Sequence, residues 1–570
     1  MTKAMHRIQR KNKFLPYLLT LPSMLLFSMF TFYPFLKTVA LSFFLTDKRG
    51  NPTKWAGISN WVRVLSKETF WKIIAITLEI AGINLVFTFG LAIFFALLSS
   101  QKKKGGKLYQ TMYALPMAIA SSPAAAIFLF IFRQKNGVVN SLLGGANIGW
   151  TTEMPYAMWA VCIMTIWMNV GISYIFLLVG FRAVPQDLIE SAYLDGAGVW
   201  ARIWHVMLPM ASPQIFFVLF LNIAISFRSF AQIKLLTGGG PANATKNLIY
   251  YIYENAIING RYETACVQAI FRSDPALYKP AVRARKKVRA LPVSTARTKK
   301  RAAEAAGFTV KLALGLVFIS PLIIGLFFSF QTEQELMSYP LHLLPQHFTL
   351  ENYQAVFAKV PLLLYLKNSV IVCVIAILAQ VIFATLAAYA FACFEFPFKK
   401  LLFSLVLATT MVPGEVVVVT NYLTIQNMGL TNSYAGLVLP SLISGTAIFL
   451  MRQYFLALPK EYKEAATIDG CGEIGYLFRV AMPLAVPTFA SLAIYLFVQI
   501  YNQFFWPLLV THENAMRTIQ IGIAFLVTGD VISFGQILAG AMIAILPSVL
   551  VYILGQDYII QGMTAGGIKG

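Results

Sequence analysis

The segment PQDLIESAYLDG at residues 185–196 recurs as PKEYKEAATIDG at residues 459–470, 274 residues further along the chain. Both copies keep a proline, a glutamate and a final Asp-Gly at the same positions. Two further prolines follow each copy at equal distances: Pro209 and Pro213 in the first, and Pro483 and Pro487 in the second. With average residue usage, matching four such positions is roughly a one per cent event, and two more prolines make it rarer still. The chain therefore contains an internal sequence repeat.

Each copy predicts a short polar helix, a turn and a second short helix. A proline suits the start of a helix, because its fixed φ is helical and no amide donor is lost there. Glycine at 196 and 470 admits a positive φ and lets the chain reverse. We call residues 185–213 the first knob and residues 459–487 the second knob. A plain amphipathic helix lying at a membrane interface is the alternative, and two copies in register argue against it.

Composition predicts an all-α polytopic membrane protein. Of 570 residues, 58% are hydrophobic and 12% charged, which excludes a soluble enzyme. The net charge of +23 comes from short Lys and Arg runs between apolar segments, so the positive-inside rule explains it better than nucleic-acid binding. The five cysteines show no metal-type spacing. Basic residues up to Lys13 precede a long apolar run, which predicts a retained first helix and a cytoplasmic N-terminus.

Apolar runs long enough to span a bilayer predict eleven helices. The first half has five, near 15–45, 71–99, 109–132, 156–181 and 210–233. The second half has six, near 308–330, 362–392, 400–425, 434–456, 482–508 and 534–555. Counted from a cytoplasmic N-terminus, the first knob lies on the cytoplasmic side, and the second does so as well if the helix at 308 begins in the cytoplasm. The halves then form two parallel repeats of about six transmembrane helices each.

One stretch breaks the repeat. Residues 271–307 carry eleven Lys and Arg against Asp274 and Glu304, where a sixth helix is expected. The predicted division is therefore a first half at 1–270, a basic linker or aberrant junction at 271–307, and a second half at 308–570. Two explanations remain open: a native basic linker after a short helix, or two adjacent subunits joined by a reading-frame error.

The knobs resemble the EAA motif of the inner-membrane permease subunits of ATP-binding-cassette (ABC) importers. The matching residues are Glu190, Ala192, Asp195, Gly196 and Pro209, and Glu464, Ala465, Ala466, Asp469, Gly470 and Pro483. The first copy departs from the motif by having Ser191 as its second residue. Residues 236–241, residues 501–508 and the tail at 562–570 are similar to permeases of the carbohydrate uptake family, of the glycerol-3-phosphate or oligosaccharide type.

The resemblance implies two permeases fused in one chain with the type I ABC importer fold. The chain would import a sugar or glycerol phosphate across a bacterial inner membrane and would not itself be an enzyme. Its implied partners are the lipid bilayer, a cytoplasmic ATPase dimer that grips both knobs, and an extracytoplasmic binding protein that meets Gly238, Gly239, Gly240 and Pro241. The sequence lacks a Gly-x-x-x-x-Gly-Lys-Ser/Thr phosphate loop. ATP and magnesium are therefore expected on the partner, with no cofactor or metal on this chain.

Polar residues within the predicted spans are candidates to line the substrate pathway. They are Glu79, Asn84, Arg228, Gln380, Glu415, Asn421, Tyr501, Asn502, Gln503 and Trp506. Arg228 could meet an anionic sugar or pair with a carboxylate. The amides could bind sugar hydroxyls or bond neighbouring helices, and the aromatic residues could stack on a sugar or form an interfacial belt. Pro116 and Pro413 predict broken helices beside the pathway.

Two other functional classes are alternatives. An ion-coupled secondary transporter of the parallel-repeat type is the main alternative, but such a carrier needs no docking knob. A membrane-embedded enzyme would need convergent ionisable groups, and the five histidines are scattered.

Overall fold

A computed structural model describes residues 14–101, 105–272, 300–412, 414–528 and 533–565. Within these ranges the chain is helical apart from one antiparallel hairpin, formed by β1 (Phe44–Thr46) and β2 (Pro52–Trp55), in which Phe44 pairs with Trp55. The prediction of an all-α membrane protein is confirmed.

Six continuous helical stretches are long and apolar enough to cross a membrane. They are α2 to α3 (Leu15–Leu41, with a π-helical turn at Ser28–Phe32), α5 (Glu68–Ser99), α9 (Tyr156–Arg182), α17 (Lys300–Ser329), α20 (Leu362–Cys393) and α31 (Phe534–Ala565).

Five further spans are pairs of helices bent by 49° to 104°. They are α6 and η2 with α7 (Gly106–Ala118 and Ser121–Ile131), α11 to α12 with α13 (Val199–Met210 and Ser212–Ser226), α21 with α22 (Lys399–Met411 and Gly414–Asn427), α23 and η6 with α24 (Tyr434–Ser441 and Gly445–Ala457), and α26 to α27 with α28 (Glu473–Leu484 and Val486–Tyr501). With each bent pair taken as one span, the described residues give eleven spans, five before residue 272 and six after residue 300, as the sequence predicts.

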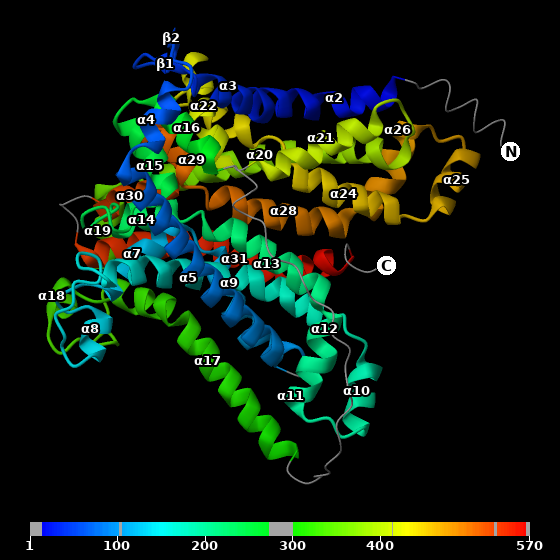
Figure 1. The fold of residues 1–570 in the computed structure, drawn as a ribbon. Coiled ribbons are helices and arrows are strands. Elements are labelled where there is room, and N and C mark those ends of the chain that lie inside the picture. Colours follow the sequence, from blue (N-terminus) through cyan, green and yellow to red (C-terminus); the bar gives the residue numbers. More distant parts are fainter. Residues whose placement is uncertain (1–13, 102–104, 273–299, 413, 529–532, 566–570) are drawn as a thin grey trace.

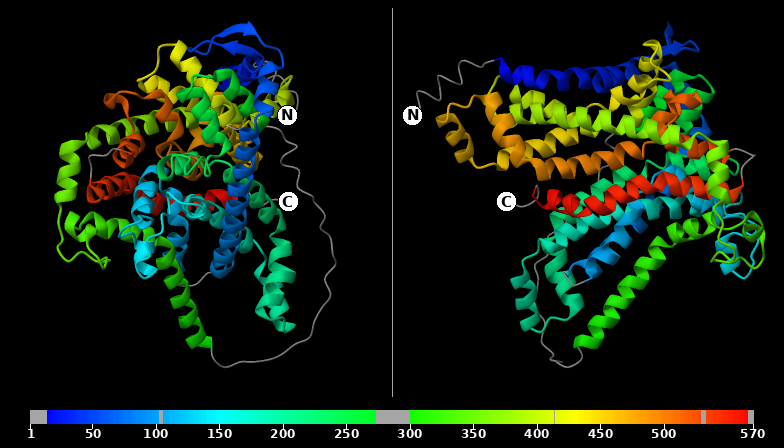
Figure 2. Two further views of the ribbon diagram at one scale, coloured as in Figure 1. Left: turned by 60° about the vertical axis from the view of Figure 1, so that its left-hand side comes forward. Right: turned by 180° about the vertical axis from the view of Figure 1, so that it is seen from behind.

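The spans run between two ends of the molecule (Figures 1 and 2). At the knob end lie α10 (Gln186–Leu194), α11 (Val199–Arg202), α25 (Lys460–Ile468) and α26 (Glu473–Tyr476). At the opposite end, which we call the hairpin end, lie β1, β2 and a set of short helices. These are α4 (Ser59–Leu65), α8 (Val138–Leu142), α14 (Phe230–Leu236), α15 (Leu248–Tyr253), η4 (Glu254–Ile258), α16 (Tyr262–Arg272), α18 (Glu333–Met337), α19 (Glu351–Lys359), α29 (Phe505–Val510) and α30 (Ile519–Thr528).

Side-chain contacts repeat between the halves as the helices do. The Thr77 hydroxyl of α5 accepts a hydrogen bond from the Leu248 amide, and the Ser369 hydroxyl of α20 accepts one from the Ile519 amide, both at 2.9 Å. Asn60 and Asn352, each 17 residues earlier than these hydroxyls, donate to backbone carbonyls just after the first span of their half. The equivalence of α5 with α20 therefore holds at the level of single residues, with a spacing of 292.

The first span of each half packs on the other half. The α2 helix lies along α20, and α3 lies along α22, where the hydroxyls of Thr38 and Thr420 are 3.0 Å apart. In return α17 packs on α6, and its carbonyl at Phe318 accepts a hydrogen bond from the Trp167 indole at 2.7 Å. These exchanged helices join the halves into one body.

The chain changes ends between the halves. Phe271 packs edge-on against Phe70 at the hairpin end, with ring centroids 5.2 Å apart. Phe308 packs against Tyr109 at the start of α6, near the knob end. The sixth crossing expected for the first half falls in 273–299, outside the described residues, so both explanations of that stretch remain predictions.

Candidate functional site

Both knobs end their first helix with the same turn. Gly196 and Gly470 have φ of 76° and 77°. The amides of Ala197 and Cys471 donate to the carbonyls of Ala192 and Ala466 at 2.9 and 2.8 Å. With the bonds from the glycine amides themselves, this is the Schellman arrangement that satisfies the last carbonyls of a helix. The Asp-Gly pairs therefore fix the shape of the knobs.

The acidic residues of segments 185–196 and 459–470 face outward. Glu190, Asp195, Glu464 and Asp469 are exposed, as are Pro209, Ala465 and Pro483, whereas Ala466 is buried against the body of the protein. Large apolar side chains are exposed beside them, including Leu194 and Trp200 in the first knob and Ile468 in the second. A rigid surface that mixes acidic and apolar side chains is suited to gripping by a partner protein.

A hydrogen bond to a partly buried carboxylate joins the second knob to α20. Glu473 accepts from the Tyr389 hydroxyl at 2.8 Å and pairs with Lys463 at 2.9 Å. The Glu473 side chain is only 16% exposed, and Tyr389 is fully buried. Sequence reasoning missed these three residues. A signal was available in the sequence. At the corresponding positions the first half has the apolar residues Ile189, Val199 and Leu97, so the three polar residues are exceptions to the repeat.

Two contacts at repeat-related positions join the halves beside the broken helices. Arg228, just after α13, lies 3.4 Å from Glu415 at the start of α22. Asn502, just after α28, donates to the carbonyl of Ala118 in η2 at 3.0 Å. The knob spacing of 274 relates Arg228 to Asn502, and the spacing of Pro116 to Pro413 relates Ala118 to Glu415. One side of the pseudo-symmetric pair is therefore ionic and the other neutral.

The broken helices lie where the prolines predict them. The bend between α6 and α7 measures 104° and directly follows the turn that contains Pro116. The bend between α21 and α22 measures 95°. Pro413 itself lies outside the described residues.

The other polar candidates mostly bond neighbouring helices. Gln380 donates to the Ser441 carbonyl at 2.6 Å, Gln503 to the Ser441 hydroxyl at 3.4 Å, Asn421 to the Phe30 carbonyl at 3.1 Å, Asn84 to the Ser229 hydroxyl at 3.3 Å, Tyr501 to the Ala544 carbonyl at 2.9 Å, and Trp506 to the Gly436 carbonyl at 3.1 Å. Glu79 lies apart from this group, exposed on α5. Roles for these residues in contact with a substrate remain predictions.

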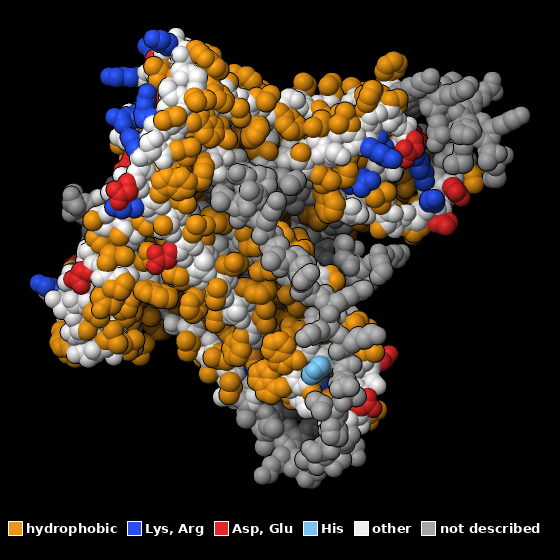
Figure 3. Space-filling view, viewed as in Figure 1, with side chains coloured by type: hydrophobic (Ala, Val, Ile, Leu, Met, Phe, Trp, Pro, Cys, Tyr) orange, Lys and Arg blue, Asp and Glu red, His pale blue; other side chains and the backbone are white. Residues whose placement is uncertain are grey.

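Aromatic side chains close the hairpin end between the halves. Phe230 of α14 packs on Phe505 of α29, with ring centroids 4.1 Å apart, and Tyr253 packs on the same ring. The space-filling view shows a hollow between two arms on the knob side (Figure 3). The interior is therefore more open toward the knobs than toward the hairpin.

The glycine-rich loop after α14 is compact. Gly238 and Gly239 take positive φ, and the Thr245 hydroxyl donates to the Gly240 carbonyl at 2.7 Å. Lys246 and Glu254 form an ion pair at 2.7 Å beside it. The exposed tip, which includes Gly238, lies at the hairpin end.

A family model for the inner membrane component of binding-protein-dependent transport systems matches this chain twice, at residues 88–271 and 359–564. The arabinooligosaccharides transport system permease protein AraQ of Halalkalibacterium halodurans is 35% identical over 267 residues, which are 45% of this chain and 96% of AraQ. The sn-glycerol-3-phosphate transport system permease protein UgpA of Agrobacterium fabrum is 30% identical over 262 residues, 45% of this chain and 89% of UgpA. A solved bacterial ABC transporter involved in alginate import has a chain that is 27% identical, with a TM-score of 0.42, and the match covers 48% of this chain and 95% of that one.

Proposed function

We propose, from the premise that the chain belongs to the family of binding-protein-dependent transport system inner membrane components, that it forms the whole translocation pathway of one ABC importer. Relatives of this kind are transport permeases that each match about half of the chain. The two halves supply both permeases, and ATP with magnesium binds the partner ATPase. This chain takes part in transport without catalysing a reaction of its own.

One observation carries the proposal: each knob continues through a single bent helix pair to a contact with the other half. The first knob leads through α12 (Leu208–Met210) into α13, which ends beside Arg228 and its partner Glu415. The second knob leads through α27 (Met482–Leu484) into α28, which ends at Asn502 and its partner Ala118. When an ATPase draws the knobs together, these two helices shift both contacts at the broken helices. The hollow on the knob side then closes as the aromatic contact at the hairpin end opens.

The hairpin end is extracytoplasmic and the knob end cytoplasmic in this proposal, so the N-terminus lies inside the cell. The supporting observation is that the start of α2 and both knobs lie at the same end. The glycine-rich loop after α14 then faces a binding protein that delivers the substrate.

The substrate class is a sugar or a glycerol phosphate. AraQ and UgpA are named for an arabinooligosaccharide and for sn-glycerol 3-phosphate. Arg228 is 54% exposed although it lies near Glu415, so its guanidinium keeps donors free for a hydroxyl or phosphate oxygen.

The test is ATP hydrolysis in proteoliposomes that contain this chain, its ATPase and its binding protein. Substrate-loaded binding protein should stimulate hydrolysis severalfold, and Glu464→Lys with Gly470→Pro should abolish that stimulation, because proline cannot adopt the positive φ of position 470. Gly198→Ala is a matched control in a knob, since its added methyl group meets open space. Uptake that needs an ion gradient and persists without ATP would instead establish the secondary transporter.

A further inference from the structure

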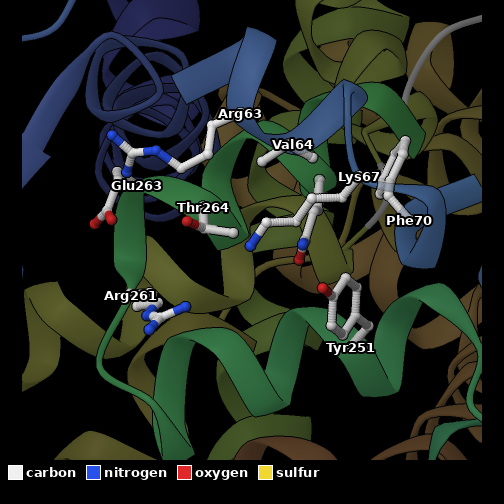
Figure 4. A pocket seen from close by; sticks show the side chains of 9 residues that line it. Arg63, Val64, Lys67, Phe70, Tyr251, Arg261, Glu263 and Thr264 are labelled. Atoms are coloured by element: carbon white, nitrogen blue, oxygen red, sulfur yellow. The ribbon is translucent and has the colours of Figure 1, made fainter. Parts of the chain in front are cut away.

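A cavity of about 300 Å³ opens at the hairpin end of the first half. It lies between α4, the start of α5, α15 and α16, and the residues that matter most are Arg63, Lys67, Tyr251, Arg261 and Glu263 (Figure 4). In this view Lys67 points into the space from one side and Arg261 faces it from the other. The volume suits a small ligand or a headgroup.

The cations of this cavity are left without acidic partners. Arg63, Lys67 and Arg261 are exposed and form no ion pair with any residue in the described part of the chain. Glu263 is buried and accepts a hydrogen bond from the Thr46 hydroxyl at 2.6 Å. Three positive charges therefore face one negative charge, and the surplus favours an anion.

In the described part of the second half, the equivalent lysine is bonded to a neighbouring helix. There Lys359, the counterpart of Lys67, donates to Gln536 of α31 at 3.0 Å. Gly535 and Gly540 let α31 approach α19 closely, and Val356 is fully buried between them. In the second half the counterpart of Lys67 therefore has a side-chain partner on α31, whereas Lys67 lines the cavity.

The charge also runs against the usual distribution in membrane proteins. Lys and Arg concentrate on the cytoplasmic side, yet residues 46–70 carry five of them against two acidic residues. Figure 3 shows these basic side chains gathered over β1, β2 and α4. In the orientation that we propose, these basic residues lie on the extracytoplasmic side. The positive-inside rule does not account for them there, and binding of an anionic ligand does.

A tryptophan at the end of a span lies in sequence just beyond the cavity residue Lys67. Lys67 is the residue that precedes the first turn of α5, and Trp71, four residues on, is 48% exposed while its indole donates to the Leu65 carbonyl at 2.7 Å. Tryptophan at the end of a span marks the membrane interface.

We propose that this cavity is a phosphate-binding site that holds the headgroup of an anionic phospholipid or the phosphate of a soluble sugar phosphate. Lys67 and Arg261 contact the phosphate oxygens, Arg63 adds charge at the rim, and the Tyr251 hydroxyl adds a neutral donor. None of the candidate pathway residues lines this cavity.

Native mass spectrometry of the full chain in detergent provides the lipid arm, with phosphatidylglycerol compared against phosphatidylcholine. Calorimetric titration with sn-glycerol 3-phosphate provides the soluble arm. Lys67→Ala with Arg261→Ala should weaken binding of the effective probe roughly tenfold or more, because charge-assisted hydrogen bonds are lost. Arg49→Ala with Lys54→Ala removes the same charge from the neighbouring hairpin and should change binding little.

Glu263→Gln tests whether the negative charge of Glu263 weakens binding of the anionic probe. It keeps an acceptor for Thr46 and removes the opposing charge, so the probe should bind more tightly. Phosphatidylglycerol binding that glycerol 3-phosphate cannot displace assigns the site to lipid, and displacement assigns it to a soluble phosphate. Equal losses in the cavity and hairpin variants, or binding of neither probe to the unaltered chain, would overturn the proposal.

Discussion

The two knobs share one backbone turn, but Glu473 ties the second to α20, whereas the first has Val199 at that place. All of α10 is exposed or half-buried, while the second knob buries Ala466, Tyr476 and Leu477. In the first knob Arg202 stacks on Tyr193 at 5.2 Å, a contact that stays within the knob. The second knob is therefore bonded to a spanning helix through Glu473, whereas the Arg202 contact of the first knob stays within that knob.

The two knobs therefore share the surface that is exposed to a partner, whereas the residues that hold each knob to the rest of the protein differ. The turn that exposes Asp195 and Asp469 is the same in both halves. The residues that face the body of the protein differ in charge, size and burial.

The largest expected effect comes from breaking the anchor. Glu473→Ala removes the partner of Lys463 and leaves the Tyr389 hydroxyl buried without that acceptor, which should destabilise the protein by about 2–3 kcal/mol. Val199→Ala, at the equivalent exposed position, should change stability by about 0.5 kcal/mol or less. Thermal unfolding in detergent compares the two variants, and equal shifts would mean that the knobs are held alike.

A smaller loss should follow from removing the hydroxyl alone. Tyr389→Phe deletes the hydroxyl that donates to both the carboxylate and the backbone carbonyl of Glu473, and it keeps the ring packing against Phe394 and Phe455. We expect a loss of about 1–1.5 kcal/mol. Combined with Glu473→Gln, the loss should be less than the sum of the single losses, because both changes act on one contact. Additive unfolding free energies would exclude a shared anchor.

The two contacts between the halves should respond differently to salt. Arg228→Ala and Asn502→Ala should each cost about 1 kcal/mol. The coupling of Arg228 with Glu415, measured by a double-mutant cycle, should shrink as ionic strength rises, because Arg228 is more than half exposed. The effect of Asn502→Ala should stay constant, and a salt response of equal size would remove the distinction between the ionic and neutral contacts.

The smallest effect concerns the β1–β2 hairpin, which follows the first span of the first half. In the second half the helix α18 follows the first span instead. The backbone amide of Asn51 donates to Asp47 and holds the pKa of that carboxyl below its ordinary value. The carboxylate therefore supports the turn fully above the ordinary pKa, and this support is lost as pH falls through the lower folded value. Limited proteolysis of the hairpin at pH 7 and pH 3 should show faster cleavage at low pH, and Asp47→Asn should flatten the response.

The sequence predicts the number of spans, because hydropathy measures the cost of leaving apolar residues in water, and each predicted run between 15 and 555 has a span in the structure. It also predicts the breaks beside Pro116 and Pro413, since proline removes a helical hydrogen bond. The bend between α23 and α24, whose first segment includes Pro440, was not predicted.

Contacts between segments far apart in the chain could not be predicted from the sequence. Nothing local to Arg228 identifies Glu415 as its neighbour, 187 residues away. Glu473 looks like an ordinary surface residue until the fold brings Tyr389 to it. The cavity at Lys67 depends in the same way on α16 lying against α4.

The exchange of first helices has a consequence for how such a protein is made. A fragment that ended before residue 273 would present α2 without its groove on α20, and a fragment that began at residue 300 would present α17 without its groove on α6. Each fragment would leave exposed to lipid a surface that packs, in the full chain, against a helix of the other half. A single polypeptide supplies each of these helices together with the helix it packs on, in equal numbers.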